Sequence, residues 1–139
     1  MYGEYEHTVD AKGRMNFPAK LREYYGDHFY ISKTIDEECL TVYNEEGWNA
    51  LKEKLKGKPT KIVNKIERFL FAGACTAEPD KQGRIALPQS LREFAHIESE
   101  VVVIGLEDHA EIWDKASWAE YNKRVTVEDI AALTEEIDF

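Results

Sequence analysis

Apolar and polar positions along this chain alternate over short segments that are separated by Gly, Pro and acidic turns. Residues 5–9 predict a strand, residues 10–13 a turn, and residues 14–17 a returning strand. Asp at the start of such a turn bonds its own backbone and Gly at its end accepts a positive φ, which favours a short hairpin. Two further strands are predicted over 29–35 and 39–43, joined by an acidic turn.

A short helix is predicted after the first hairpin, with Pro18 at its first position, where the missing N–H of proline is tolerated. We expect Leu21, Tyr24 and Tyr25 of this helix to face inward. The second half of the chain repeats the order of elements. Its fully apolar, β-branched segment 101–104 predicts a strand that is buried on both faces.

Helical spacing of apolar residues recurs over 48–55 and again over 62–70, and Gly57-Lys-Pro59 separates these two predicted helices. A last helix is predicted from Thr126, where residues 126–129 form a capping box. The apolar side of that helix consists of Val127, Ile130 and Leu133. That side could pack on its own chain or on a neighbour, and the pattern alone leaves both open.

The segment 80–93 repeats the segment 10–23 at an offset of 70 residues without a gap. Both segments follow D-x-x-G-R-x-x-x-P-x-x-L-R-E, and Trp48 aligns with Trp118 at the same offset. A whole structural unit is therefore duplicated. Each unit of about seventy residues is marginal for a core of its own, so we expect the two units to share one core.

These patterns predict an α+β protein made of two pseudo-symmetric units with short helices. We divide the chain into a first repeat over 1–56, a connecting helix over 57–72, a second repeat over 73–125 and an acidic C-terminal helix over 126–139.

Composition predicts an ordinary globular protein without a membrane span or a secretory signal, since 43% of residues are hydrophobic and the mean hydropathy is -0.53. Cys39 and Cys75 form no C-x-x-C pair, which favours reduced thiols in a cytoplasmic protein. The four histidines have no ligand spacing. We therefore expect neither a metal nor a cofactor.

The net charge of -9 is distributed unevenly along the chain. Residues 1–70 contain 12 Lys/Arg and 12 Asp/Glu, whereas residues 71–139 contain 6 and 15, so all the excess acid lies in the second half. An acidic chain disfavours nucleic acid as a partner unless it has a local basic patch. The first repeat offers such a patch in Lys12, Arg14, Lys20 and Arg22.

The D-x-x-G-R turn is the candidate site. We assign Asp10, Asp80, Gly13 and Gly83 to structuring the two loops, because a carboxylate repels phosphate and Gly allows the tight turn.

Arg14 and Arg84 lie just past the turns, where a planar guanidinium could bind a phosphate or a guanine edge with two hydrogen bonds. Each could equally form a structural ion pair with the aspartate of its turn, and the residues alone leave both roles open. Lys12 would add a phosphate contact. Arg22 and Arg92 are expected to be exposed residues on the helices that follow.

An enzyme is a competing class. Glu107 and Asp108 could form an acid–base pair or a Mg²⁺ site, but no motif organises the carboxylates. The chain also lacks a phosphate-binding Gly-rich loop, a nucleophile elbow and an H-E-x-x-H motif. We therefore expect no catalytic residues and no small-molecule substrate.

The order of strand, D-x-x-G-R turn, strand, Pro-capped helix, two strands and helix resembles the AbrB/SpoVT group of swapped-hairpin DNA-binding modules. Its duplication at a fixed offset closely resembles the MraZ family of bacterial transcriptional regulators, over nearly the whole chain. The resemblance implies two AbrB-like β-barrel or swapped-hairpin units. It also implies a cytoplasmic, nucleoid-associated regulator of the division and cell-wall gene cluster.

The same resemblance implies double-stranded DNA as the partner, bound at repeated promoter boxes by a ring of identical chains. It favours DNA contact by Arg14 and Arg84, together with Lys12, Lys20 and Lys81. The second repeat is less basic, because Gln82 and Ser90 stand where the first has lysines. A self-assembling structural protein without DNA binding is the alternative, and the basic first hairpin, which has no role in pure assembly, argues against it.

Overall fold

The computed structural model describes residues 1–139 and contains the same order of elements twice. The first half comprises β1 (Tyr2–Thr8), β2 (Arg14–Asn16), α1 (Ala19–Tyr25), β3 (Phe29–Lys33), β4 (Leu40–Tyr43), α2 (Glu45–Leu55) and α3 (Thr60–Leu70). The second comprises β5 (Cys75–Ala77), β6 (Arg84–Ala86), α4 (Gln89–Phe94), β7 (Glu100–Leu106), β8 (His109–Asp114), α5 (Lys115–Arg124) and α6 (Val127–Glu136).

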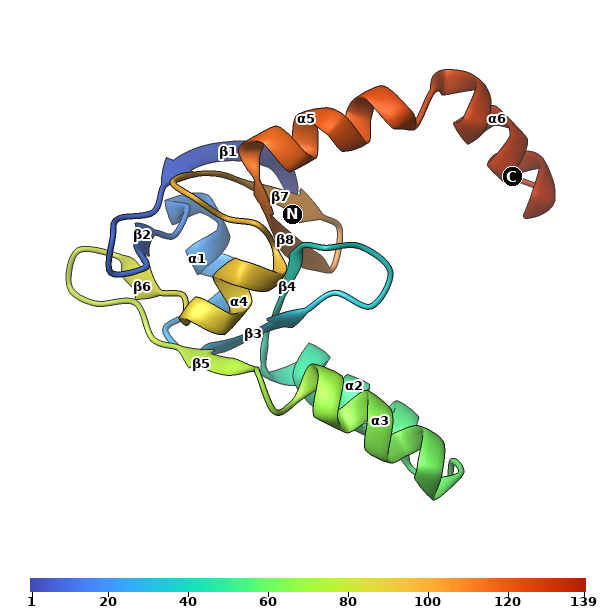
Figure 1. Ribbon diagram of the computed structural model, residues 1–139, viewed down its shortest axis with the longest axis horizontal. Helices are drawn as coiled ribbons and strands as arrows, with labels where there is room; N and C mark the ends of the chain where they lie inside the picture. Colours follow the sequence, from blue (N-terminus) through green and yellow to red (C-terminus); the bar gives the residue numbers. More distant parts are fainter.

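The two halves interleave in one antiparallel sheet of six strands, in the order β1-β7-β8-β4-β3-β5 (Figure 1). The β3–β4 and β7–β8 hairpins meet at the centre, where β4 pairs with β8. Each outer strand joins the hairpin of the other half, β1 beside β7 and β5 beside β3. The strand order therefore has a pseudo-twofold axis between β8 and β4.

A second, two-stranded sheet joins β2 to β6, again one strand from each half. The expectation of β-barrel units is wrong, because the large sheet is open: its outer strands, β1 and β5, lie at opposite edges and do not pair with each other. Neither half closes on itself, since only its hairpin pairs internally, whereas its other two strands, β1 and β2 or β5 and β6, find their partners in the other half.

One apolar core of 19 buried residues contains side chains from both halves. Met15 and Ile85, which face each other across the β2–β6 ribbon, contribute to it, as do Leu21 of α1 and Leu91 of α4. The ribbon and the two short helices therefore pack against the same sheet. The segment 101–104 is buried at every position, as predicted, within the strand β7, which is flanked by β1 and β8.

Most predicted elements are confirmed, but two details of α1 differ. Pro18 is the N-cap residue and Ala19 opens the helix. Leu21 and Tyr25 are buried as predicted, whereas Tyr24 is 41% exposed. The Tyr24 hydroxyl instead donates to the Asp108 carbonyl in the β7–β8 turn at 2.9 Å, so that the ring lies along the surface.

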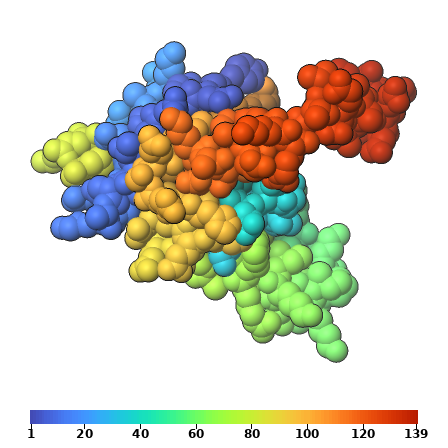
Figure 2. Space-filling model, turned by 45° about the horizontal axis from the view of Figure 1, so that its top comes forward, coloured from blue at the N-terminus to red at the C-terminus, as the bar shows by residue number.

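Two helical arms extend from the body. α2 and α3 form one arm, and α5 leads into α6 in the other, which ends as a separate knob (Figures 1 and 2). The predicted capping box of α6 is present: Thr126 Oγ1 accepts from the Asp129 N–H, and the Asp129 carboxylate accepts from the Thr126 N–H. None of the helices is long and apolar enough to cross a membrane.

Candidate nucleic-acid interface

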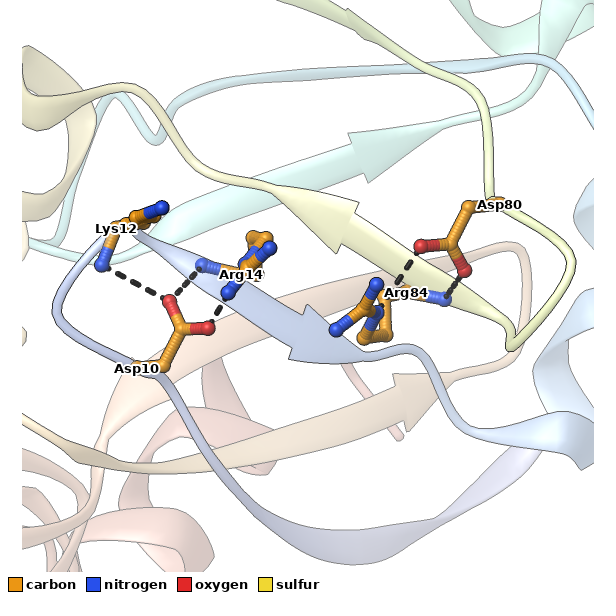
Figure 3. A network of polar contacts seen from close by, with 5 residues as sticks. All are labelled: Asp10, Lys12, Arg14, Asp80 and Arg84. Atoms are coloured by element: carbon orange, nitrogen blue, oxygen red, sulfur yellow. Dashed lines mark hydrogen bonds and ion pairs between the residues drawn. The ribbon is translucent and has the colours of Figure 1, made fainter.

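The side chain of Asp10 closes the first turn. Its Oδ1 atom accepts hydrogen bonds from the backbone N–H groups of Lys12 and Arg14, both at 2.9 Å. Its Oδ2 atom accepts from Arg14 Nε at 2.9 Å (Figure 3). One carboxylate thus holds both the turn and the orientation of the guanidinium.

The second turn has the same geometry. Asp80 Oδ1 accepts from the backbone N–H groups of Gln82 and Arg84 at 2.9 Å, and Oδ2 accepts from Arg84 Nε at 3.0 Å. Gly13 and Gly83 have φ angles of 85° and 79°. Because a side chain disfavours this left-handed region, the glycine of each motif is suited to its place in the turn.

Arg14 and Arg84 lie on the outer face of the β2–β6 ribbon, while Met15 and Ile85 between them point into the core. In the antiparallel register the two arginines are diagonal neighbours, one on each strand (Figure 3). The sequence repeat, which separates them by 70 residues, therefore becomes a spatial pair.

The pKa of the Asp10 carboxyl is lowered because the backbone N–H of Arg14 donates to it, and the Arg14 guanidinium adds to the effect. The pKa of Asp80 is lowered by the matching contacts of Arg84. Each carboxylate stays ionised at neutral pH and orients its arginine through Nε. Within the chain no hydrogen bond involves the terminal nitrogens of either guanidinium, and the side chains of Arg14 and Arg84 are 41% and 36% exposed.

The lysines predicted for the site lie in different places. Lys12 and Lys81 are exposed within the two turns, next to the arginine pair. Lys20 is also exposed, in the first turn of α1, but it lines a shallow hollow with Tyr2 and Tyr5 of β1. The ribbon therefore places Arg14 and Arg84 side by side, with Lys12 and Lys81 in the turns at its two ends, whereas Lys20 lies apart from the ribbon on α1.

Arg22 and Arg92 are not the exposed residues that the sequence predicts; both are half-buried. Arg22 lies over Gly83 of the other repeat, where an added Cβ would be 2.8 Å from its Nη1, and Arg92 lies over Gly13 in the same way. Arg92 Nε donates to the Leu87 carbonyl at 3.0 Å, whereas Arg22 Nε is buried without a partner. Interleaving causes this, because it brings each helix beside the opposite turn. Because the two arginines occupy matching positions of the motif, the sequence indicates that they share a role. It does not identify the glycine of the other repeat as their contact.

We expect Gly13→Ala to destabilise the protein more than Gly57→Ala. Both glycines have a positive φ, which disfavours alanine by about 1–3 kcal/mol. A Cβ at Gly13 would also lie 2.5 Å from the Leu87 carbonyl oxygen, whereas one at Gly57 would meet nothing within 4 Å. Urea unfolding measures the free energy of unfolding of both variants. Because both positions have a positive φ, the difference between the two variants reports the close approach to Leu87 alone. Equal destabilisation would show that the turn can move away from Leu87.

Other candidate chemistry is not organised into a site. No three His, Cys, Asp or Glu side chains come together to hold a metal ion, and Cys39 and Cys75 are free thiols. Asp108 Oδ1 lies 2.8 Å from Nδ1 of the adjacent His109 in the β7–β8 turn. The ribbon with its twin turns is thus the one place where the duplicated motif forms a joint surface.

Fold and site together define a class: a duplicated α+β protein whose repeats exchange strands and present paired D-x-x-G-R turns on one ribbon. The family described as "MraZ protein, putative antitoxin-like" matches residues 1–65 and 70–138. The chain belongs to this family.

Relatives match over nearly their whole length. The protein named transcriptional regulator MraZ of Thermoanaerobacter pseudethanolicus is 46% identical, with 99% of each chain covered. Its namesake from Caldanaerobacter subterraneus is 47% identical, with 94% of each covered. A solved structure, the solution structure of PHS018 from Pyrococcus horikoshii, aligns at 20% identity and a TM-score of 0.31, over 78% of this chain and 84% of that one.

Proposed function

We propose that this protein is a sequence-specific DNA-binding transcriptional regulator, without catalytic activity, that contacts DNA through the twin turns of the β2–β6 ribbon. The observation that carries the proposal is the pairing of Arg14 with Arg84 on one exposed face, with terminal guanidinium nitrogens that no other group of the chain engages. The relatives' name, transcriptional regulator, points to the same function.

The dimensions of DNA support this choice of element. The major groove admits a two-stranded β-ribbon, and a guanidinium can donate two hydrogen bonds to O6 and N7 of guanine. Asp10 and Asp80 hold Nε of each arginine and so orient the fork before DNA arrives, while Lys12, Lys20 and Lys81 supply phosphate contacts. Ordering the fork in advance lowers the entropic cost of binding.

We propose that the exchange of strands is the swapped-hairpin arrangement of AbrB-like modules, with repeats over 1–56 and 73–125, a connecting helix over 57–72 and a terminal helix over 126–139. A ring of identical chains would present several weakly binding ribbons to repeated promoter boxes, since linked sites multiply affinity. The division and cell-wall gene cluster is the proposed target, and the cytoplasm, at the nucleoid, the proposed location.

Salt dependence tests the DNA contact directly. Each phosphate neutralised by Lys or Arg should add roughly -0.9 to the slope of log affinity against log salt concentration. We therefore expect a steep slope when fluorescence anisotropy follows binding to a labelled duplex from upstream of the protein's own coding sequence. The slope should become shallower in a Lys12→Gln variant, which matches the Gln82 of the second repeat. Absent or salt-independent binding would instead favour a self-assembling structural protein.

A further inference from the structure

Helix α6 exposes an apolar side that nothing in its own chain covers. None of its residues is buried. The exposed apolar side chains, with their exposed fractions, are Val127 (81%), Ile130 (49%), Leu133 (53%) and, just beyond the helix, Ile137 (72%) and Phe139 (96%). An apolar stripe of this kind on a projecting arm marks an interaction surface.

The corresponding helix of the first half, α3, has a similar apolar stripe. α6 occupies the place in the second half that α3 occupies in the first, and their first residues, Thr60 and Val127, are 67 residues apart. At that offset Ile130 matches Val63, Leu133 matches Ile66 and Ile137 matches Leu70. In α3 these positions are half-buried or buried, and Val63 lines a hollow together with Lys52 and Leu55 of α2. α6 therefore retains the apolar pattern of a packed helix but has no helix to pack on.

The two pairs of helices are also connected differently. Four residues, 56–59, join α2 to α3, and these two helices lie side by side (Figure 1). Only Val125 and Thr126 separate α5 from α6, and α6 points away from the body. Across this two-residue linker α6 does not fold back along α5, so its apolar side is left without a neighbouring helix.

A hollow with matching chemistry lies on the arm formed by α2 and α3. It is lined by Leu55, Val63 and Phe71, with Lys52, Lys56 and Glu67 at its border. Its apolar floor could receive an apolar helix side. The hollow and α6 lie on separate arms in both views, which argues against α6 filling the hollow of its own chain (Figures 1 and 2).

The opposite charges of α6 and the α2–α3 arm indicate which surface α6 binds. Residues 126–139 contain five acidic and no basic side chains, whereas residues 52–68 contain seven basic and two acidic ones. α6 would repel a second α6 but would be attracted to the α2–α3 arm. An acidic helix with an apolar stripe and a basic arm with an apolar hollow thus occur on the same chain.

We propose that α6 of one copy docks into the hollow between α2 and α3 of the next copy. The inference rests on the self-association proposed above and assigns its interface. Such a contact is heterologous, joining two different surfaces head to tail, and it yields a closed ring if the rotation between copies closes.

Two variants with substitutions at exposed positions disrupt the two sides of the contact and leave the core unchanged. Ile130→Asp places a charge in the α6 stripe, and Ala132→Asp places the same charge on the opposite side of α6 as the matched control. Lys52→Glu combined with Lys56→Glu reverses the charge of the hollow. Circular dichroism and urea unfolding establish that each variant folds, and size exclusion with light scattering measures its mass.

We expect wild type and Ala132→Asp to assemble, and both Ile130→Asp and the double lysine variant to run as monomers of 16.1 kDa. A mixture of these two monomers should give a dimer and nothing larger, because one intact α6 meets one intact hollow and both remaining ends are blocked.

Each contrary result has its own meaning. Assembly by Ile130→Asp overturns the inference while self-association stands, and a monomeric wild type at every concentration overturns both. A mixture that stays monomeric rejects the head-to-tail arrangement. Loss of DNA binding by an assembled double lysine variant would assign the hollow to DNA instead. Arg14→Ala, which should still assemble, separates the failure of DNA contact from the failure of this interface.

Discussion

Arg14→Ala is expected to weaken specific DNA binding by about 1–3 kcal/mol for each base that the arginine would otherwise bind with two hydrogen bonds. In an assembly that engages several ribbons this penalty recurs at each one. The backbone should hardly change, because Asp10 still accepts from the N–H groups of residues 12 and 14 after the guanidinium is removed. Fluorescence anisotropy at fixed salt concentration measures the effect.

Arg84→Ala is the matched comparison and should weaken binding less. The geometry of the two turns is nearly identical, but Gln82 replaces the lysine of the first turn, and the second repeat lies in the half with the excess acid. The potential near a phosphate is therefore less favourable there. Only variants that keep the wild-type mass in light scattering should be compared. If Arg84→Ala abolished binding while Arg14→Ala was tolerated, the assignment of the repeats would be wrong.

Phe17→Ala should be the most destabilising single change among those considered, by about 3–5 kcal/mol. Phe17 is 2% exposed, and its ring centroid lies 4.7 Å from that of Phe29 and 5.7 Å from that of Tyr25. The cavity would open beneath the ribbon, at the centre of the core that both halves share. A destabilisation of this size is a large fraction of the stability of a typical domain.

Urea unfolding followed by tryptophan fluorescence checks this prediction, with Ile35→Ala as the control. Ile35 is 70% exposed, so truncating it should change the free energy of unfolding very little. A similar free energy of unfolding for the two variants would mean that the ribbon can collapse onto the sheet and fill the cavity.

Features set by neighbouring residues are predictable from the sequence. The turns at Asp10 and Asp80 follow from the spacing of Asp and Gly, and the start of α6 follows from the capping box at Thr126. In each case the hydrogen-bonding partners lie within four residues, so a short window of sequence contains both donor and acceptor.

The pairing of the strands is not predictable in this way, because alternation identifies a strand but not its partner. The duplication predicts two similar units, yet two separate units and two interleaved ones have the same sequence pattern. Interleaving is also why the predicted exposure of Arg22 and Arg92 is wrong: helical spacing places them on a helix, but the surface they meet is a glycine from the other repeat. The exposure of Tyr24 differs from the prediction for a related reason, since its hydrogen-bond acceptor, the Asp108 carbonyl, belongs to the second half.

The exchange of strands between the halves has a consequence for synthesis on the ribosome. Tyr2, in the first strand to be made, pairs with Leu106, and Phe29 pairs with Ala77. While the first half emerges, only the β3–β4 hairpin can form, and the apolar side chains of β1 and β2 have no strand to join. At roughly 5–20 residues per second this exposure lasts for several seconds. We therefore expect the nascent first half to be a substrate for ribosome-associated chaperones until β7 leaves the exit tunnel.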